Sequence, residues 1–370
     1  MKKRIVWITP DCFLDVDLPI IKELQSYYDI YWQIVIGFNN TIDYESYVAS
    51  MINSQAQVEI SFYYQKYRLR DIRNIYDYIK IINKVKSYNP DIYYLSFAAI
   101  PYGILIYRMF LPLNKCVVAC HNVSTPQGAM SGGIAKKYTY LWLKYFKNIQ
   151  VFSKGQKKVL DSKHPNKNVL MAPLAIKDYG IPTRSYDREN MQVTRFLIFG
   201  NIVEYKRVDL LIEAGNTLYK RGVKDFKIRI AGNGNVWKKY ASLIKYPDIF
   251  ELYIKRIPNE EVADLFADSH YFVMPYQDIA QSGAITVAFR YNLPTLVSDI
   301  DQFKEFVTDG VTGVTFKNKD AQDLADKMQY MIEQRKEVFP KLAKAQADYV
   351  EKELSLKSII DKYIYYLDRI

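Results

Sequence analysis

The chain is poor in cysteine, with three in 370 residues: Cys12, Cys116 and Cys120. An odd and small number in a long chain excludes a disulfide framework and favours a cytoplasmic protein. Cys116 and Cys120, together with the neighbouring His121, suggest zinc ligands, but no fourth ligand cluster accompanies them. We therefore predict no metal site, and expect the two cysteines to be buried on one face of a strand.

Long hydrophobic runs are also missing. The most apolar stretch, residues 97–113, is interrupted by Pro101, Arg108 and Pro112, and it is shorter than the roughly 20 residues that a membrane-spanning helix needs. We interpret it as a buried helix and predict no transmembrane segment. The basic start is followed by an apolar run only to Ile8, too short for the core of a signal peptide, so a buried first strand is expected.

Basic residues outnumber acidic ones, 51 to 40, and the formal net charge is +11. The excess allows a nucleic acid, an anionic membrane or an anionic small substrate as partner. No nucleic-acid-binding motif is present and the basic residues are dispersed, so we expect no nucleic acid.

Residues 136–147 combine basic and aromatic side chains at helical spacing: Lys136, Lys137, Lys144 and Lys147, with Trp142, Tyr145 and Phe146. Such a helix suits peripheral contact with anionic lipid at the inner face of a membrane. The favoured interpretation is an ordinary amphipathic helix with a core-facing side and a solvated lysine side.

Strand and helix patterns alternate along the chain. In the first half, strands are expected at 5–8, 31–36, 91–96 and 116–119, and helices at 18–28 and 72–87. In the second half, strands are expected at 196–199, 227–231, 271–274 and 295–298, and helices at 208–220, 259–267, 283–291 and 356–368. Repeated βα units predict an α/β fold with two Rossmann-like, doubly wound domains.

The expected domains are residues 1–178 and 195–353, joined by a polar linker at 179–194 and followed by a helix in 354–370 that packs back on the first domain. Because ligands bind outside the carboxyl ends of the strands in such sheets, the cleft between the domains is the expected site.

Two segments in the second half suggest phosphate binding. Lys206 and Arg207 follow a strand and Gly200, at the entrance of helix 208–220, and cations beside a helix N-terminus form an anion site. A diphosphate fits there, although a solvated basic turn is equally compatible with this segment alone. In the turn 281–284, Gly283 opens a helix whose free N–H groups can hold phosphate oxygens, and Ser282 is suited to be its N-cap.

Residues 196–315 resemble the donor domain of family-four glycosyltransferases, also called glycosyltransferase group 1. The resemblance rests on the order and spacing of short motifs: Phe199-Gly200 with Tyr205-Lys206, 230–234, 257–262, Val273 to Tyr276, 281–283, 293–294 and Glu305 to Gly313. The N-terminal half is similar to the family more loosely. The resemblance implies a two-domain GT-B fold, transfer from a nucleotide-diphosphate sugar with retention of configuration, and no obligatory metal or other cofactor.

The resemblance also assigns roles to particular residues. Lys206 matches the lysine that contacts the donor diphosphate, and 281–283 match the turn that faces the donor phosphates and sugar. His121 matches a histidine of the acceptor domain close to the reacting sugar. The full set of implied donor-binding residues is Gly200, Asn201, Lys206, Arg207, Gly232, Tyr276, Gln281, Ser282, Gly283, Ala284 and Glu305.

The chain also departs from the family. Asn201 stands where an arginine is usual, and Arg207, which replaces a common glycine, is a candidate to compensate. Ala280 and Ala288 occupy the two glutamate positions of the E-x7-E motif, which leaves the sugar and the base, UDP or GDP, open. The glycine-rich loop after the first strand is missing as well.

Other motifs are weaker. Asp299-Ile300-Asp301 spells the D-x-D metal motif of a different glycosyltransferase fold, but falls in a post-strand loop and is interpreted as coincidence. His164 and His270 are expected to be structural.

We therefore predict a glycosyltransferase that acts on a saccharide or lipid-linked saccharide acceptor in surface polysaccharide or glycoconjugate synthesis. An inactive accessory subunit of the same fold, binding glycan or a partner transferase, is the alternative, and a sugar epimerase is the less attractive third option because Ala280 and Ala288 lack the acidic groups that it needs.

Overall fold

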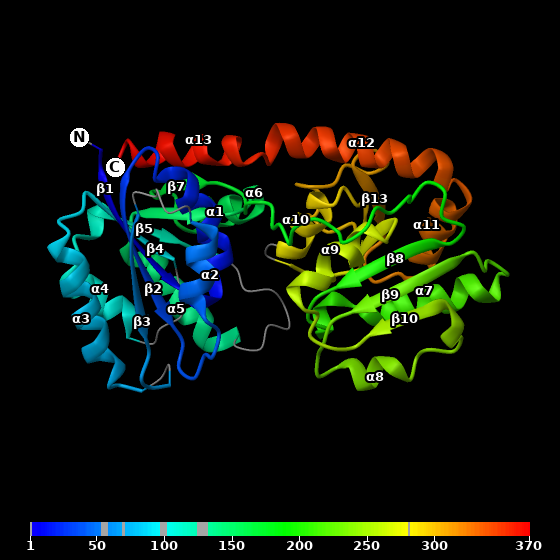
Figure 1. Ribbon diagram of the computed structural model, residues 1–370, viewed down its shortest axis with the longest axis horizontal. Helices are drawn as coiled ribbons and strands as arrows, with labels where there is room; N and C mark the ends of the chain where they lie inside the picture. Colours follow the sequence, from blue (N-terminus) through cyan, green and yellow to red (C-terminus); the bar gives the residue numbers. More distant parts are fainter. Residues whose placement is uncertain (1, 53–57, 69–70, 97–101, 124–131, 280–281) are drawn as a thin grey trace. The chain divides into compact units, whose positions relative to one another are not determined.

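The computed structural model describes residues 2–52, 58–68, 71–96, 102–123, 132–279 and 282–370. The described residues form two compact units, the first from residues 2–175 and 356–370, the second from 176–355 (Figure 1). Each unit has its own sheet and its own core.

The first unit holds a parallel sheet in the order β3-β2-β1-β4-β5-β6-β7. Its strands are β1 (Arg4–Pro10), β2 (Asp29–Ile36), β3 (Val58–Tyr64), β4 (Ile92–Ser96), β5 (Cys116–Ala119), β6 (Asn148–Val151) and β7 (Asn168–Met171). Its helices are α1 (Leu14–Leu24), α2 (Tyr44–Met51), α3 (Asn74–Ser87), α4 (Gly103–Phe110), α5 (Gly132–Tyr145), α6 (Lys154–Lys163) and α13 (Leu356–Leu367).

Alternation along the strands builds two cores, one on each face of this sheet. In β1, Ile5 and Trp7 pack against residues of α1 and α13 on one face. Val6 and Ile8 pack against residues of α3, α4 and α5 on the other. Because both faces are covered, β1 and β4 in the middle of the sheet are largely apolar, as is typical of parallel sheets.

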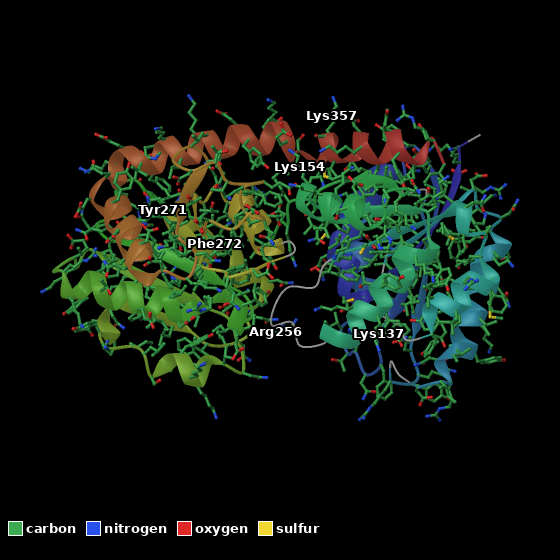
Figure 2. All side chains as sticks on the ribbon, turned by 180° about the vertical axis from the view of Figure 1, so that it is seen from behind. Lys137, Lys154, Arg256, Tyr271, Phe272 and Lys357 are labelled. Carbon is green, nitrogen blue, oxygen red and sulfur yellow. The ribbon has the colours of Figure 1, made fainter. Side chains whose placement is uncertain are left out.

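The second unit repeats this plan with the strand order β10-β9-β8-β11-β12-β13, again parallel. Its strands are β8 (Thr194–Phe199), β9 (Phe226–Ala231), β10 (Phe250–Tyr253), β11 (Tyr271–Met274), β12 (Thr295–Ser298) and β13 (Gly313–Phe316). Its helices are α7 (Val208–Lys220), α8 (Trp237–Ala241), α9 (Asn259–Ala267), α10 (Gly283–Arg290), α11 (Ala321–Glu333) and α12 (Arg335–Glu353). Figure 2 labels Tyr271 and Phe272 on β11, whose side chains enter opposite cores.

Residues 179–194, expected as the linker, lie in the second unit. The backbone N–H and the hydroxyl of Thr183 each donate to the Asp264 carboxylate at 2.9 Å, and the Tyr186 hydroxyl donates to the same carboxylate. The segment is therefore fastened to α9. The C-terminal helix α13 belongs to the first unit, where Ile359, Ile360 and Tyr363 enter the core.

One helix differs from what its apolar stretch suggests. α4 is only half buried: Ile104 and Tyr107 face the core, whereas Leu105 and Met109 are exposed, so the expectation of a buried helix at 97–113 is wrong for this part. Residues 97–101 lie outside the described residues.

In α5 and just after it, Trp142 and Phe146 are buried in the core. This confirms the core-facing interpretation of the segment 136–147, and it removes both rings from contact with lipid. Among the described residues, no helix combines the length and the apolar character needed to cross a membrane.

Candidate functional site

The candidate site of the second unit lies where its strand order reverses, between β8 and β11. Chain connections leave these neighbouring strands toward opposite sides, which opens a crevice at their carboxyl ends. Two loops start there. The loop after β8 carries Lys206, at the end of a short 3-10 helix (Glu204–Lys206), and the loop after β11 carries Tyr276.

Lys206 is the central charged group of this crevice. Its side chain is buried, with the residue only 8% exposed. Its Nζ donates to the carbonyl oxygen of Phe199 at 3.4 Å and lies 5.4 Å from the centre of the Tyr276 ring. Burial lowers the pKa of the ammonium to about 8, because a low-dielectric environment disfavours the charged form. No carboxylate of the described part of the chain forms an ion pair with Lys206.

Two glycines let the loops after β8 and β9 pass close to each other. Gly200 has a φ of +101°, and a Cβ there would lie 3.0 Å from Nζ of Lys206. Gly232 has a φ of +148°, and a Cβ there would lie 2.1 Å from the carbonyl oxygen of Gly200. Backbone hydrogen bonds from Gly200 to Ala231 and from Ile202 to Asn233, at 2.9 and 2.8 Å, join the loops. Gly200 and Gly232 thus allow the two loops to approach each other closely next to Lys206.

Arg207 is paired with a neighbouring carboxylate and is not a second free cation. It is a non-glycine residue with a φ of +50°, at the start of α7. Its Nε lies 3.0 Å from both carboxylate oxygens of Asp209 and its Nη2 lies 2.8 Å from one of them. This paired geometry neutralises the guanidinium locally. Asn201, at the position of the family's arginine, is exposed.

Tyr276 is the aromatic neighbour of the Lys206 ammonium. The ring is fully buried and packs edge-on against Tyr205 with the ring centres 5.8 Å apart. Its hydroxyl has no hydrogen-bond partner among the described residues, and burial raises its pKa. A buried hydroxyl without a partner is costly.

The N-terminus of α10 supplies backbone donors. Ser282 occupies the N-cap position, as expected, but its side chain makes no capping hydrogen bond. Gly283 is exposed and Ala284 is partly exposed, and the first N–H groups of a helix have no partner within the helix itself. Ala280 and Gln281 lie outside the described residues.

The remaining sequence candidates lie elsewhere in this unit. Glu305 is partly buried, and its carbonyl accepts a hydrogen bond from the Tyr349 hydroxyl at 3.1 Å. In the D-x-D sequence, Asp299 caps the N–H of Asn318 and Asp301 pairs with Lys304 at 2.7 Å. No cluster of three potential metal ligands exists within the described ranges. His270 is held between two backbone groups, Arg195 N–H and Arg188 C=O.

His121 belongs to the first unit, directly after β5. Its ring is stacked between Phe13 and Phe152, with ring centres 3.8 and 4.4 Å away. Burial lowers the pKa of the imidazole to about 3, so the ring is neutral at physiological pH and has one N–H donor and one acceptor nitrogen. Lys206 thus belongs to the second unit and His121 to the first.

The sequence analysis missed a buried carboxylate at the corresponding strand reversal of the first unit, between β1 and β4. Asp17 is 2% exposed and accepts hydrogen bonds from the hydroxyls of Thr9, at 2.7 Å, and Ser96. Thr9 in turn accepts from the Trp32 indole N–H at 2.8 Å. Burial raises the pKa of Asp17 to about 6. The sequence feature that could have identified Asp17 is its position in the first helix after an apolar strand.

Comparison with known proteins bears on the identity of both units. Residues 193–334 match the family model described as Glycosyl transferases group 1. A search of curated proteins gives no match.

Among solved structures, the chain is similar over its whole length to HepE of Anabaena in complex with UDP and glucose, with 11% identity, coverage of 100% of both chains and a TM-score of 0.76. A glycosyltransferase from Rickettsia africae ESF-5 gives 15% identity, a TM-score of 0.74 and coverage of 100% of this chain and 98% of that chain. A TarM mutant of S. aureus, in complex with Fondaparinux, alpha-GlcNAc-glycerol and UDP, gives 14% identity, a TM-score of 0.70 and coverage of 99% and 100%.

These matches confirm the predicted fold class and the resemblance on which it rested. At such low identity, the structural likeness establishes the fold alone, and the family model matches most of the second unit. The chain has the GT-B fold of two Rossmann-like domains, and its residues 193–334 match the family model of the glycosyl transferases group 1.

Proposed function

We propose that the chain transfers a sugar from a nucleotide-diphosphate donor, with UDP as the nucleotide, to a hydroxyl of a saccharide or lipid-linked saccharide. The family match of the second unit supports a transferase, and the UDP bound in HepE and TarM supports the choice of base. The observation that carries the proposal is the buried Lys206 ammonium, which has no carboxylate partner among the described residues, in the same unit as α10, whose start has no side-chain cap.

The chemistry follows from where charge develops. When the bond between the anomeric carbon and the diphosphate oxygen breaks, negative charge grows on the departing diphosphate. Fixed cations and helix N-termini stabilise such charge most effectively in a site from which water is excluded. Lys206 and the first N–H groups of α10 meet this need, and the Tyr276 hydroxyl offers a further donor to the same group.

Retention of configuration and independence from metal ions are part of the proposal. The lysine takes the electrostatic role that a divalent cation plays at a diphosphate in other enzymes. The neutral His121 is proposed to lie at the reacting sugar, where its N–H can donate to a sugar hydroxyl without adding charge to the site.

Binding of UDP tests the donor site directly. We expect UDP to bind in titration calorimetry, and Lys206→Met to weaken binding at least tenfold, because a diphosphate then faces a buried apolar group. Arg207→Met is the matched control: since Arg207 is paired with Asp209, its loss should change UDP affinity less than threefold. An equal loss in both variants would assign the diphosphate to Arg207 as well. Unchanged binding by Lys206→Met would refute the proposed site.

An inactive accessory subunit is the second candidate, and one observation favours it. Ala288, at the second motif glutamate, is fully buried in the core of the second unit. A chain that binds UDP but neither hydrolyses UDP-glucose or UDP-N-acetylglucosamine nor transfers the sugar to any saccharide would fit this role. Turnover of either donor, retained in the presence of EDTA, would support the metal-independent transferase.

A further inference from the structure

Three helices of the first unit, α3, α4 and α5, form a layer on one face of the sheet. Their inner sides share one core with the strands. α3 packs beside α4 and α4 beside α5, and Figure 1 shows α3 and α4 running side by side. The outer side of this layer, defined here as the outer face, is solvent-exposed.

The outer face carries several large apolar side chains that are mostly exposed. Leu105 and Met109, one turn apart on α4, are 60% and 75% exposed. Ile72, just before α3, and Tyr76, on α3, are 75% and 63% exposed, and Tyr140 on α5 is 56% exposed. Single exposed apolar residues are ordinary, but neighbouring helices that all present them indicate an interaction surface.

Within the three helices of the outer face, every exposed charged residue is basic. Its exposed basic residues are Lys80, Lys84, Lys86, Arg108, Lys136, Lys137 and Lys144, and Figure 2 labels Lys137 on α5. The only acidic residue within the three helices is Asp77, which is buried. Cations also lie over aromatic rings, with Lys80 4.4 Å from the Tyr76 ring centre and Arg108 4.2 Å from that of Tyr145.

We propose that the outer face is a peripheral docking surface for an anionic lipid bilayer. Lysines alternating with separate apolar side chains match the headgroup region, where the cations meet lipid phosphates while the apolar groups enter the acyl boundary. Protein interfaces have the opposite composition, since their buried centre is depleted of lysine. The contact does not depend on Trp142 or Phe146, and it is independent of donor binding.

Sedimentation with vesicles tests the surface on the full chain. We expect the protein to pellet with vesicles of phosphatidylglycerol and phosphatidylcholine and not with phosphatidylcholine alone. The double variant Leu105→Glu/Met109→Glu should lose at least tenfold in vesicle affinity, because both side chains are exposed and their replacement puts negative charge on the surface. The triple variant Lys136→Gln/Lys137→Gln/Lys144→Gln, which leaves the apolar residues intact, should lose severalfold.

Ile181→Glu is the matched control, because Ile181 is an 86% exposed apolar residue of the second unit. It should bind vesicles as the parent chain does, and circular dichroism should show all variants folded. Absence of pelleting with anionic vesicles would overturn the proposal. So would equal losses for Ile181→Glu and the α4 double variant, or binding to poly-glutamate with no binding to vesicles, which would identify an acidic protein as the partner.

Discussion

Lys206 shows how one residue can link folding and binding. Its ammonium is buried between the Phe199 carbonyl and the Tyr276 ring, and the pKa of about 8 measures the resulting desolvation. A bound diphosphate would relieve this cost by pairing with the charge. The charged form of Lys206 is therefore less stable in the empty site than in the occupied site.

A pH dependence of UDP binding follows from this residue. Because the pKa of Lys206 in the free protein is about 8, the ammonium is lost as pH rises through that value. UDP affinity should therefore fall above pH 8, approaching about tenfold per pH unit for one linked proton. Calorimetry between pH 7 and 9.5 measures the slope. Lys206→Met should bind weakly with a flat profile, and a flat profile in the parent chain would contradict the shifted lysine.

Asp17 predicts a pH effect on stability. Its folded pKa of about 6 lies above the ordinary pKa of an aspartate, 3.8, so folding favours the protonated form. That contribution is present in full below pH 3.8 and is lost as pH rises through 6, about 3 kcal/mol in all. Relative to the parent, Asp17→Asn should therefore become more stable as pH goes from 4 to 7. Urea unfolding at the two pH values checks this; an unchanged difference would mean that Asp17 titrates normally.

At the scale of elements, the crossing of the loops after β8 and β9 depends on glycine. Gly232→Ala should destabilise the protein by about 2–4 kcal/mol, because its Cβ would meet the Gly200 carbonyl at 2.1 Å in addition to the strain of a positive φ. Gly222 also has a positive φ, +86°, but open space around it, so Gly222→Ala isolates the backbone term, about 1 kcal/mol. Similar unfolding midpoints for both variants would show that the loops can move apart.

The elements that the sequence predicted are those with a strong local pattern. The apolar run Ile5–Ile8 and the helical spacing of 208–220 indicate β1 and α7 because burial acts on consecutive or periodic residues. β6 was missed because it buries polar groups: the Asn148 amide donates to the carbonyls of Asn114 and Cys116, and Gln150 bonds Tyr363. Only tertiary partners make such a strand stable, so its own residues do not reveal it.

Only part of the candidate site was predicted from the sequence. Lys206 and the start of α10 were found because cations, glycines and helix starts follow strands in a recognisable order. The pairing of Arg207 with Asp209 was not predicted, because it depends on the left-handed backbone of Arg207. Asp17 was overlooked because its hydroxyl partners, Thr9 and Ser96, are brought together only by the sheet.

At the scale of the whole molecule, the two proposed binding surfaces respond differently to salt. The cations of the outer face are exposed, whereas Lys206 is buried. Ions in solution screen exposed charges over a Debye length of about 10 Å at 0.1 M salt and about 3 Å at 1 M, and buried charges much less. Raising sodium chloride from 0.05 to 0.5 M should release the protein from anionic vesicles while lowering UDP affinity far less. Equal losses of vesicle binding and of UDP affinity would contradict this difference between exposed and buried cations.

The place of α13 in the first unit has a consequence for how the protein is made. Ile359, Ile360 and Tyr363 complete a core whose other members precede residue 176. A ribosome synthesises the entire second unit before it reaches this helix. During translation the part of this core that α13 covers therefore stays exposed until the second unit has been made, and a chaperone can bind it in that interval. A chain released after residue 355 should expose that face, bind the dye ANS and aggregate, even though its second unit is whole.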